Sequence, residues 1–290
     1  MDANAFARGR TLAALLLLLV APGSATRAQP AADSARPAPR ELRVCADPNN
    51  LPFSNQRLEG FENKIATLIA GELHATLSYD WRPQRRAFVR RTLNAHRCDL
   101  IVDVPSTFDL VLPTKPFYRS TYVFVYAKSR GLHLQSLDDP VLRRLRIGVH
   151  AIGDDYANTP PAQALARRHI VDNVVGYSMF GDSLEESPPA KIIDAVAAGE
   201  IDVAIVWGPY AGYFAKRESV PLAVVPVAPS EDPPGQPFAF DMSIGVRHGD
   251  EALKRELEEV LDRRRDAVRQ ILRDFGVPLV DSTELHAARQ

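Results

Sequence analysis

Short apolar runs alternate along the chain with stretches in which apolar residues recur every three or four positions. Residues 42–46, 75–79 and 98–102 predict three strands, and residues 60–73 and 84–95 predict the helices between them. The run at 98–102 is almost continuously apolar, as expected of a parallel strand that is covered on both faces. This order of strand, helix, strand, helix and strand predicts an open α/β sheet.

The same order begins again after a strong strand predicted at 121–126. The second series ends in a loop predicted at 207–210, which lies at the carboxyl end of its last strand. Gly199 suits the C-terminus of the helix before that strand. The predicted strands of this series are 145–149, 173–177 and 201–206, and its predicted helices are 163–169 and 189–198.

The last part of the chain differs from both series, with a strand predicted at 238–246 and a long amphipathic helix at 251–275. Together these elements predict an α/β fold of two doubly wound lobes with a hinge of two crossing segments, near 126–130 and 225–238. Closure of such a hinge traps a ligand between lobes in other proteins. Lobe 1 is predicted at 41–126 plus 238–278, lobe 2 with the hinge segments at 127–237, and a C-terminal tail at 279–290.

The N-terminus has the pattern of a secretory signal. Arg8 and Arg10 precede a short apolar run at 12–20, and small residues follow, which predicts a signal peptide at 1–28 and export to the periplasm. An uncleaved membrane anchor is the alternative. Residues 29–40 are rich in Ala and Pro and predict a disordered linker. No later stretch is long and apolar enough to predict a membrane span.

Cys45 and Cys98 are the two cysteines of the chain, and both fall in predicted strands of the first lobe. Two cysteines in an exported chain predict a disulfide if the two strands bring them close together. Two buried thiols that pack as small apolar side chains are the alternative. The sequence leaves both open.

Composition and motifs favour binding over catalysis. The chain has 290 residues, of which 46% are hydrophobic, and its 35 basic and 36 acidic residues argue against a nucleic-acid binder. The seven histidines are scattered without the i, i+4 pair of a zinc helix, and neither a G-x-S-x-G motif nor a phosphate-binding glycine loop is present. We therefore expect no catalytic residue, no metal and no cofactor.

Four stretches are distinctive: VCADPNNLPFSN at 44–55, GFENKIA at 60–66, PQRR at 83–86 and PFYRSTYV at 116–123. With the order of elements over 41–278, they resemble the type II periplasmic solute-binding proteins, and within them the branch associated with quinoprotein dehydrogenases. That branch includes the J protein encoded beside PQQ-dependent methanol dehydrogenases. The resemblance implies a periplasmic accessory role in the oxidation of methanol or a related alcohol.

Two positions depart from the amino-acid-binding relatives in this family. Those relatives hold the ligand carboxylate with an arginine in the region of 105–113, which has no arginine here, and the ligand ammonium with an acid where 207–209 reads Trp-Gly-Pro. A zwitterion needs both charges paired, because an unpaired charge in a closed cleft is strongly unfavourable. The departures argue against a free amino acid and leave an open, aromatic cleft for another small molecule or part of a partner protein.

Aromatic and polar side chains near the predicted strand ends are the candidates for this cleft, because ligands bind at the carboxyl ends of the strands in open α/β sheets. Core packing of the aromatic residues and turn capping by the polar residues are the alternatives. The candidates are Asp47, Asn49, Asn50, Phe53, Glu62, Trp81, Asp103, Trp207, Tyr210 and Asp241.

A cluster of arginines lies in the helix predicted at 84–95 and beside it. Such a cluster suits an acidic partner, such as a dehydrogenase or a cytochrome, through complementary charge. A solvated helix face is the alternative. The candidates for partner docking are Arg82, Arg85, Arg86 and Arg90.

The sequence thus supports three functions to different degrees. The first is an accessory protein that binds or activates a PQQ-dependent methanol or alcohol dehydrogenase, with the c-type cytochrome of that system as a further candidate partner. The second is the receptor of an ABC transporter for a small solute other than an amino acid. The third is an enzyme on the same fold, such as a dehydratase, which the lack of catalytic motifs disfavours.

Overall fold

The computed structural model describes residues 40–152, 157–179 and 187–280. The predicted signal peptide at 1–28, the linker up to residue 39 and the tail beyond residue 280 lie outside these residues. Within the described residues, no helix has the length and apolar character that crossing a membrane requires.

The strands range from two-residue pairs to the ten-residue β7. They are β1 (Glu41–Ala46), β2 (Asn49–Asn50), β3 (Ser54–Asn55), β4 (Thr76–Trp81), β5 (Leu100–Pro105), β6 (Leu112–Pro113), β7 (Tyr118–Ala127), β8 (Ile147–Ile152), β9 (Ala157–Asn158), β10 (Val174–Ser178), β11 (Val203–Trp207), β12 (Leu222–Pro226), β13 (Glu231–Asp232), β14 (Gln236–Pro237) and β15 (Ala239–Val246).

Helices connect most of the longer strands, and two of them end the described chain. The α-helices are α1 (Phe61–Glu72), α2 (Phe88–Arg91), α3 (Pro160–Arg167), α4 (Lys191–Ala197), α5 (Gly208–Ala215), α6 (Glu251–Arg263) and α7 (Arg265–Asp274), and the 3₁₀ helices are η1 (Lys128–Arg130), η2 (Pro140–Arg144) and η3 (Pro188–Ala190).

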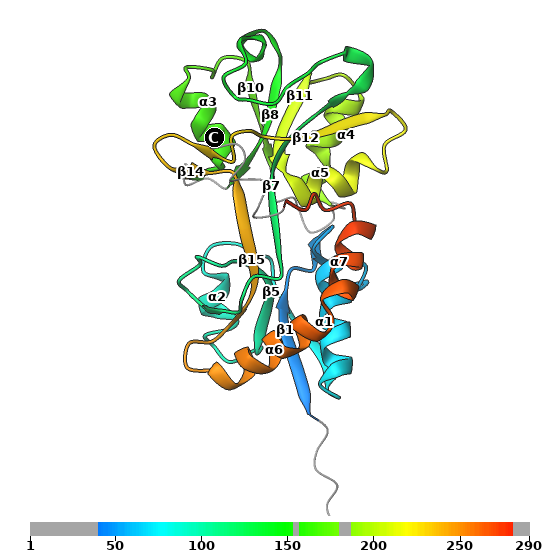
Figure 1. The fold of residues 1–290 in the computed structure, drawn as a ribbon, viewed down its shortest axis with the longest axis vertical. Coiled ribbons are helices and arrows are strands. Elements are labelled where there is room, and N and C mark those ends of the chain that lie inside the picture. Colours follow the sequence, from blue (N-terminus) through cyan, green and yellow to red (C-terminus); the bar gives the residue numbers. More distant parts are fainter. Residues whose placement is uncertain (1–39, 153–156, 180–186, 281–290) are drawn as a thin grey trace, which may run out of the picture. The chain divides into compact units, whose positions relative to one another are not determined.

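Eleven strands form one mixed sheet with the central order β10-β8-β11-β7-β15-β5-β1-β4 (Figure 1). We call β1, β4, β5, β6 and β15 the first strand group, and β8, β9, β10, β11 and β12 the second strand group. In the first group β1 runs parallel to β4 and β5, and in the second β8 runs parallel to β10 and β11. The fold is therefore α/β, as the sequence predicts, with two series of parallel strands.

The long strand β7 belongs to both groups. Its residues 118–121 pair with β15, whereas its residues 122–127 pair with β11 and β12. The chain therefore changes groups between Thr121 and Tyr122, and the crossing predicted near 126–130 is wrong. The apolar pattern of a strand is the same whichever neighbour it pairs with, so the pattern could not locate the change.

Three other predicted elements need correction. The helix predicted at 84–95 shortens to α2, because Ala87 has a left-handed backbone (φ 67°) that a right-handed helix does not include. The helix predicted at 251–275 is divided at Arg264 into α6 and α7. The loop predicted at 207–210 is the start of α5, where Pro209 occupies the first turn, a position that suits proline.

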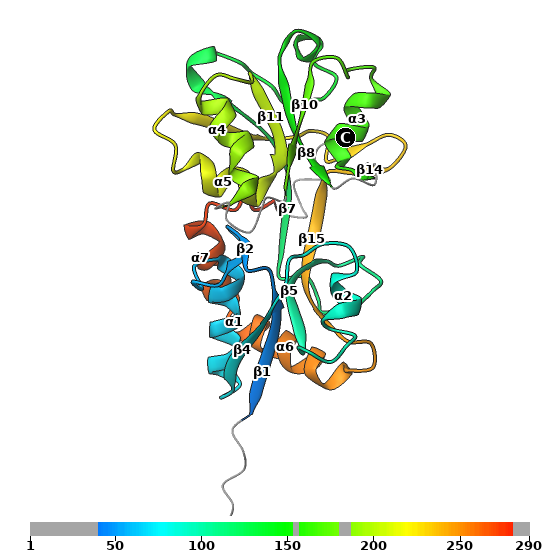
Figure 2. The same cartoon turned by 180° about the vertical axis from the view of Figure 1, so that it is seen from behind.

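Alternating residues of the strands fill hydrophobic cores on the two faces of the sheet. In β11, Ala204 and Val206 belong to a core that includes Ala211 of α5, while Val203 and Ile205 belong to a second core with α3. Figure 2 shows α3 and α4 on opposite sides of β8, α1 and α6 beside β1, and α7 at the upper end of α1. Because both faces of the sheet are covered here, the central strands β5 and β11 are nearly continuous apolar runs, whereas β4 and β10 at the sheet edges are less buried.

Candidate functional site

The loop after β1 is held against the start of α1 by backbone contacts. The N–H groups of Phe61 and Glu62 donate to the carbonyl oxygens of Pro52 (2.8 Å) and Phe53 (2.9 Å). A Cβ atom on Gly60 would lie 1.9 Å from the Phe53 oxygen, so this close approach requires glycine. Glu62, in the first turn of α1, is thereby fixed beside the loop and is only 3% exposed.

Asp47 ties the loop after β1 to the segment after β4. Its two carboxylate oxygens accept hydrogen bonds from the backbone N–H groups of Asn49 (2.9 Å) and Gln84 (2.7 Å). Burial raises the pKa of Asp47, and the two hydrogen bonds act against this rise. The position of Asp47 is therefore set by the backbone of both segments.

Buried Glu62 and half-buried Asp103 of β5 interact electrostatically. Burial, together with the negative charge of Asp103, raises the pKa of Glu62 well above its usual range. Burial also raises the pKa of Asp103 to about 7, although the hydroxyl of Tyr118 opposes the rise by donating to both carboxylate oxygens at 2.9 Å. The protonated form of Glu62 is therefore favoured, and Asp103 titrates near neutral pH.

Tyr210 of α5 connects the second strand group to the loop after β1, which lies beside Glu62. Its hydroxyl donates to Oδ1 of Asn50 at 2.9 Å, and its ring packs edge-on against the ring of Phe53 with 5.0 Å between centroids. The side chain is 4% exposed, and burial holds the pKa of Tyr210 far above its usual value. A second bond across the groups, from the N–H of Ser187 to Oδ1 of Asn49, is 3.3 Å long.

His150 of β8 completes the surroundings of Tyr210. Its ring meets the Tyr210 ring edge-on at 5.3 Å, and its Nε2 lies 3.2 Å from the carbonyl oxygen of Pro189, to which it donates. Burial lowers the pKa of His150 to about 4, so the imidazole is neutral at pH 7. This histidine is 2% exposed and belongs to the buried interior.

Seven of the ten predicted cleft residues thus lie in one neighbourhood, formed by the loop after β1, α1, β5 and α5. Asn49 and Asn50 face residues of the second strand group, so the predicted open, aromatic cleft is closed by direct contact here. Within this neighbourhood we call the residues around Tyr210 the Tyr210 cluster, which contains five of the seven together with Tyr118 and His150. Its members are Asn50, Phe53, Glu62, Asp103, Tyr118, His150 and Tyr210.

The other three predicted residues have different surroundings. Trp81 pairs in register with Ala46 and stacks on the Tyr79 ring at 4.5 Å. Trp207 packs between Tyr122 of β7 and Phe240 of β15, at 5.4 and 5.7 Å between ring centroids. Asp241 of β15 is paired with Arg119, 2.9 Å away, and 45% of its side chain is exposed.

Two members of the cluster were not predicted from the sequence. Tyr118 lies in the stretch 116–123 that carries the resemblance, so its hydroxyl group marks it as a candidate for the site. Nothing in the sequence marks His150, because a single histidine within an apolar strand is most simply a core residue.

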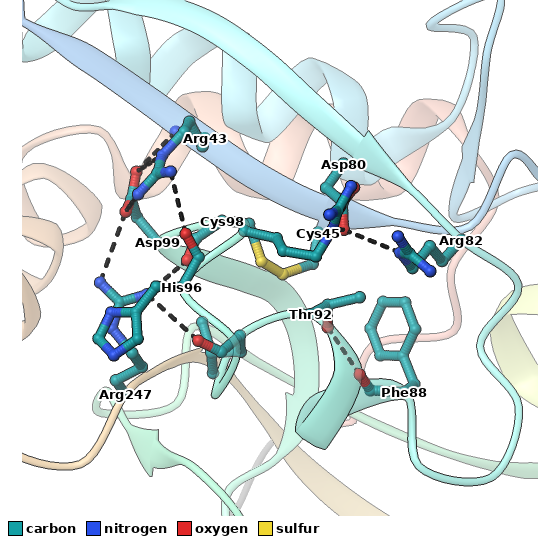
Figure 3. The surroundings of a disulfide bond; sticks show 12 residues. Arg43, Cys45, Asp80, Arg82, Phe88, Thr92, His96, Cys98, Asp99 and Arg247 are labelled. Carbon is teal, nitrogen blue, oxygen red and sulfur yellow. Dashed lines mark hydrogen bonds and ion pairs between the residues drawn. A yellow bond between two sulfur atoms is a disulfide. The ribbon is translucent and has the colours of Figure 1, made fainter.

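A disulfide between Cys45 and Cys98 links β1 to the chain just before β5, with Cα atoms 5.5 Å apart (Figure 3). On one side of it Arg43 donates to Asp99 at 2.7 Å, and on the other Arg82 donates to Asp80 at 3.2 Å. The segment between β4 and β5 is therefore fixed at its base by a covalent bond and by ion pairs.

We call residues 82–91 the basic segment. Arg82 forms an ion pair with Asp80, so its charge is already neutralised within the chain. Arg85, Arg86 and Arg90 are exposed. In the part of the chain that the structure describes, Arg86 and Arg90 have neither an ion pair nor a hydrogen bond through their guanidinium groups.

The Tyr210 cluster is suited to holding protein segments together. Its hydroxyl groups donate to the amide and carboxyl groups of the cluster, and burial favours the uncharged forms of Glu62, Asp103 and His150. Among residues 40–152, 157–179 and 187–280, no three His, Cys, Asp or Glu side chains are grouped so that they could hold a metal ion.

Comparisons with known proteins agree with this fold. No protein-family model matches the chain. The chain is 30% identical to "Protein MoxJ" of Methylorubrum extorquens over 262 residues, which cover 86% of this chain and 85% of that one.

Two solved structures are similar over most of the chain. The crystal structure of the periplasmic binding protein XoxJ from Methylobacterium extorquens AM1 has 39% identity, a TM-score of 0.69, and coverage of 83% of this chain and 100% of that one. The structure of MxaJ from Methlophaga aminisulfidivorans has 27% identity, a TM-score of 0.72, and coverage of 82% and 100%. The chain therefore belongs to the MoxJ family and has the fold of the type II periplasmic solute-binding proteins.

Proposed function

We propose that the chain is a non-enzymatic accessory protein of the periplasm that binds a PQQ-dependent methanol or related alcohol dehydrogenase. The observation that carries this proposal is the match to MoxJ and XoxJ over more than four fifths of the chain. The sequence resemblance to the J proteins encoded beside such dehydrogenases supports it. The N-terminal signal pattern supports a periplasmic location.

The surroundings of Tyr210 favour this function over that of a solute receptor. In a receptor, the ligand occupies the space between two lobes. Here Tyr210 contacts Asn50 and Phe53 directly, and its hydroxyl takes a polar partner that a solute would otherwise supply. We infer that the two strand groups act as lobes that are held together by their own side chains, with β7 and β15 as the hinge segments.

The basic segment is the proposed docking surface for the dehydrogenase. Arg86 and Arg90 are exposed, and within the described residues no acidic side chain neutralises them. The disulfide at the base of the segment reduces the conformational entropy that would be lost on binding. Exposed charges of this kind mainly increase the rate of association with a partner of opposite charge.

The test is a binding measurement between the mature chain and the dehydrogenase purified from the same organism, with the c-type cytochrome as a second analyte. We expect a 1:1 complex in size-exclusion chromatography, and association that is slowed about tenfold or more by the Arg86→Glu, Arg90→Glu double variant. Arg144→Glu with Arg255→Glu is the matched control, because both residues are exposed and the change in net charge is the same. The proposal is wrong if the wild-type chain forms no complex with either protein.

A receptor of an ABC transporter for a small solute is the alternative, which the fold alone would permit. A solute that binds tightly raises the melting temperature by mass action. Thermal-shift screening of small metabolites against the mature chain distinguishes the two functions. A large, saturable shift with one solute would favour the receptor.

A further inference from the structure

A groove lies on the first strand group, away from the basic segment. It is bounded by residues 115–119, which lead into β7, by the helices α6 and α7, and by residues 277–280 after α7. Its volume is 580 Å³, which is within the range of about 300–1,000 Å³ of sites that bury a ligand. Asp241, which the sequence assigned to the cleft between the lobes, lines this groove instead.

The acidic side chains of the groove already have basic partners. Asp241 is paired with Arg119 at 2.9 Å, and Asp262 with Arg265 at 2.9 Å. Glu258 accepts hydrogen bonds from Lys254 at 2.5 Å and from the backbone N–H of Lys115 at 2.7 Å. The acids of the groove are therefore neutralised without using the remaining arginines.

Among the described residues, two arginines of α7 have no partner for their side chains. Arg269 and Arg273 line the groove and are exposed, and over the ranges that the structure describes their guanidinium groups form no ion pair or hydrogen bond. Arg119 also lines the groove, but its guanidinium is paired with Asp241 and its Nε is buried, so the charges available to a ligand are those of α7. The groove therefore has an excess of positive charge, although the chain as a whole has a net charge of −1.

The remaining lining is apolar and comes from four segments of the chain. Leu261 and Val268 are buried residues of α6 and α7, Phe117 precedes β7, and Val277 and Leu279 follow α7. A ligand for this groove must supply carboxylates for the arginines and apolar side chains for the rest. We propose that the groove binds an extended acidic segment of a partner protein in which carboxylates alternate with apolar residues.

The spacing of the two arginines supports a polypeptide over a small anion. Arg269 and Arg273 are four residues apart on one helix, which places their Cβ atoms about 5–6 Å apart. Alternate side chains of an extended chain are about 6.6 Å apart on one face, so two carboxylates at positions i and i+2 match the two arginines. The residues between them face the other way, where the apolar side chains of the groove can receive them.

This inference adds a second surface to the proposed function, but it can be tested without the dehydrogenase. The probe is a fluorescein-labelled peptide of about eight alternating glutamate and leucine residues, titrated against the mature chain at low ionic strength and followed by fluorescence anisotropy. We expect saturable binding that the Arg269→Glu, Arg273→Glu double variant weakens about tenfold or more. A peptide of alternating lysine and leucine should not bind.

Two further variants separate charge from folding. Arg269→Lys with Arg273→Lys should retain most of the binding, since the positive charge is kept. Arg144→Glu with Arg255→Glu changes the net charge by the same amount at exposed residues that do not line the groove and should leave peptide binding within about twofold. Equal binding by the wild type and the Arg269→Glu, Arg273→Glu variant would overturn the proposal. So would tight competition by citrate, which would indicate a site for a small anion.

The dehydrogenase then separates this inference from the proposed function. If the wild type binds the dehydrogenase and Arg269→Glu with Arg273→Glu binds it equally well, the groove is not used and the proposed function stands. If the peptide binds in the groove but the dehydrogenase binds no variant, the groove inference stands and the proposed partner is wrong. Weakened binding of both probes to the α7 variant supports both.

Discussion

The hydroxyl of Tyr210 donates a hydrogen bond to Oδ1 of Asn50 over 2.9 Å. Tyr210 lies on α5, beside the second strand group, whereas Asn50 follows β1 of the first. The same tyrosine ring packs on Phe53, three residues after Asn50. One side chain therefore connects the two strand groups through its polar and its apolar atoms.

Tyr210→Phe tests this connection. The variant keeps the ring and leaves Oδ1 of Asn50 without its donor, so we expect a loss of about 1 kcal/mol of unfolding free energy. For a chain of this size, that corresponds to a fall of about 2–4 °C in melting temperature, measured by calorimetry. Tyr177→Phe is the control, because the Tyr177 hydroxyl has no hydrogen-bond partner among the described residues. An equal fall in both variants would mean that the bond to Asn50 contributes nothing specific.

Asp103→Asn should change how stability depends on pH. The pKa of Asp103 is about 7 in the fold and about 3.9 in an unfolded chain. The folded state therefore binds more protons, and the wild type loses stability as the pH rises from about 4 to 7. The variant lacks this loss, so its unfolding free energy relative to the wild type should rise across that window by an amount on the order of a few kcal/mol.

The measurement is urea denaturation of both proteins at pH values from 4 to 8. Asp172→Asn, which removes an exposed carboxyl, serves as the control and should follow the wild type at every pH. Parallel curves for Asp103→Asn and the wild type would contradict the raised pKa of Asp103.

His150→Gln should show the opposite dependence. The pKa of His150 is about 4 in the fold and about 6.5 in an unfolded chain, so the wild type loses stability as the pH falls from about 6.5 to 4. Glutamine can still donate to the Pro189 oxygen but does not titrate. The variant should therefore gain stability relative to the wild type as the pH falls through this window, in the same denaturation experiment. His133→Gln, at an exposed site, should not.

Replacing both cysteines should destabilise the chain and loosen the basic segment. The disulfide closes a loop across 53 residues, for which the chain-entropy model gives about 4 kcal/mol. We expect Cys45→Ala with Cys98→Ala to lower the unfolding free energy by about 2–4 kcal/mol in urea denaturation. A reductant should lower the stability of the wild type but not that of the double variant. Equal stability of the two proteins without reductant would show that the bond does not constrain the unfolded chain.

The sequence predicted the longer strands except β12, and most helices, because their signal is local. Apolar runs such as 98–102 mark buried parallel strands, and the loop after β1 was expected near other strand ends because parallel strands finish at one edge of a sheet. That rule brought Asp47, Glu62 and Asp103 together without knowledge of the tertiary structure.

The parts that were not predicted depend on contacts between distant residues. The left-handed backbone of Ala87 shortens a helix that the apolar pattern would extend. Trp207 packs on β7 and β15, which become its neighbours only in the folded chain. The sequence could not predict that Tyr210 fills the predicted cleft, because this depends on α5 packing against the loop after β1.

The shared strand β7 restricts how this chain can vary in length. Side chains alternate between the two faces of a sheet, so one residue inserted between Thr121 and Tyr122 would turn residues 122–127 to the wrong face. Val123 and Val125 would then point toward the core that now contains Phe124 and Tyr126, and the reverse. The ten-residue length of β7 is therefore fixed by its two sets of neighbours.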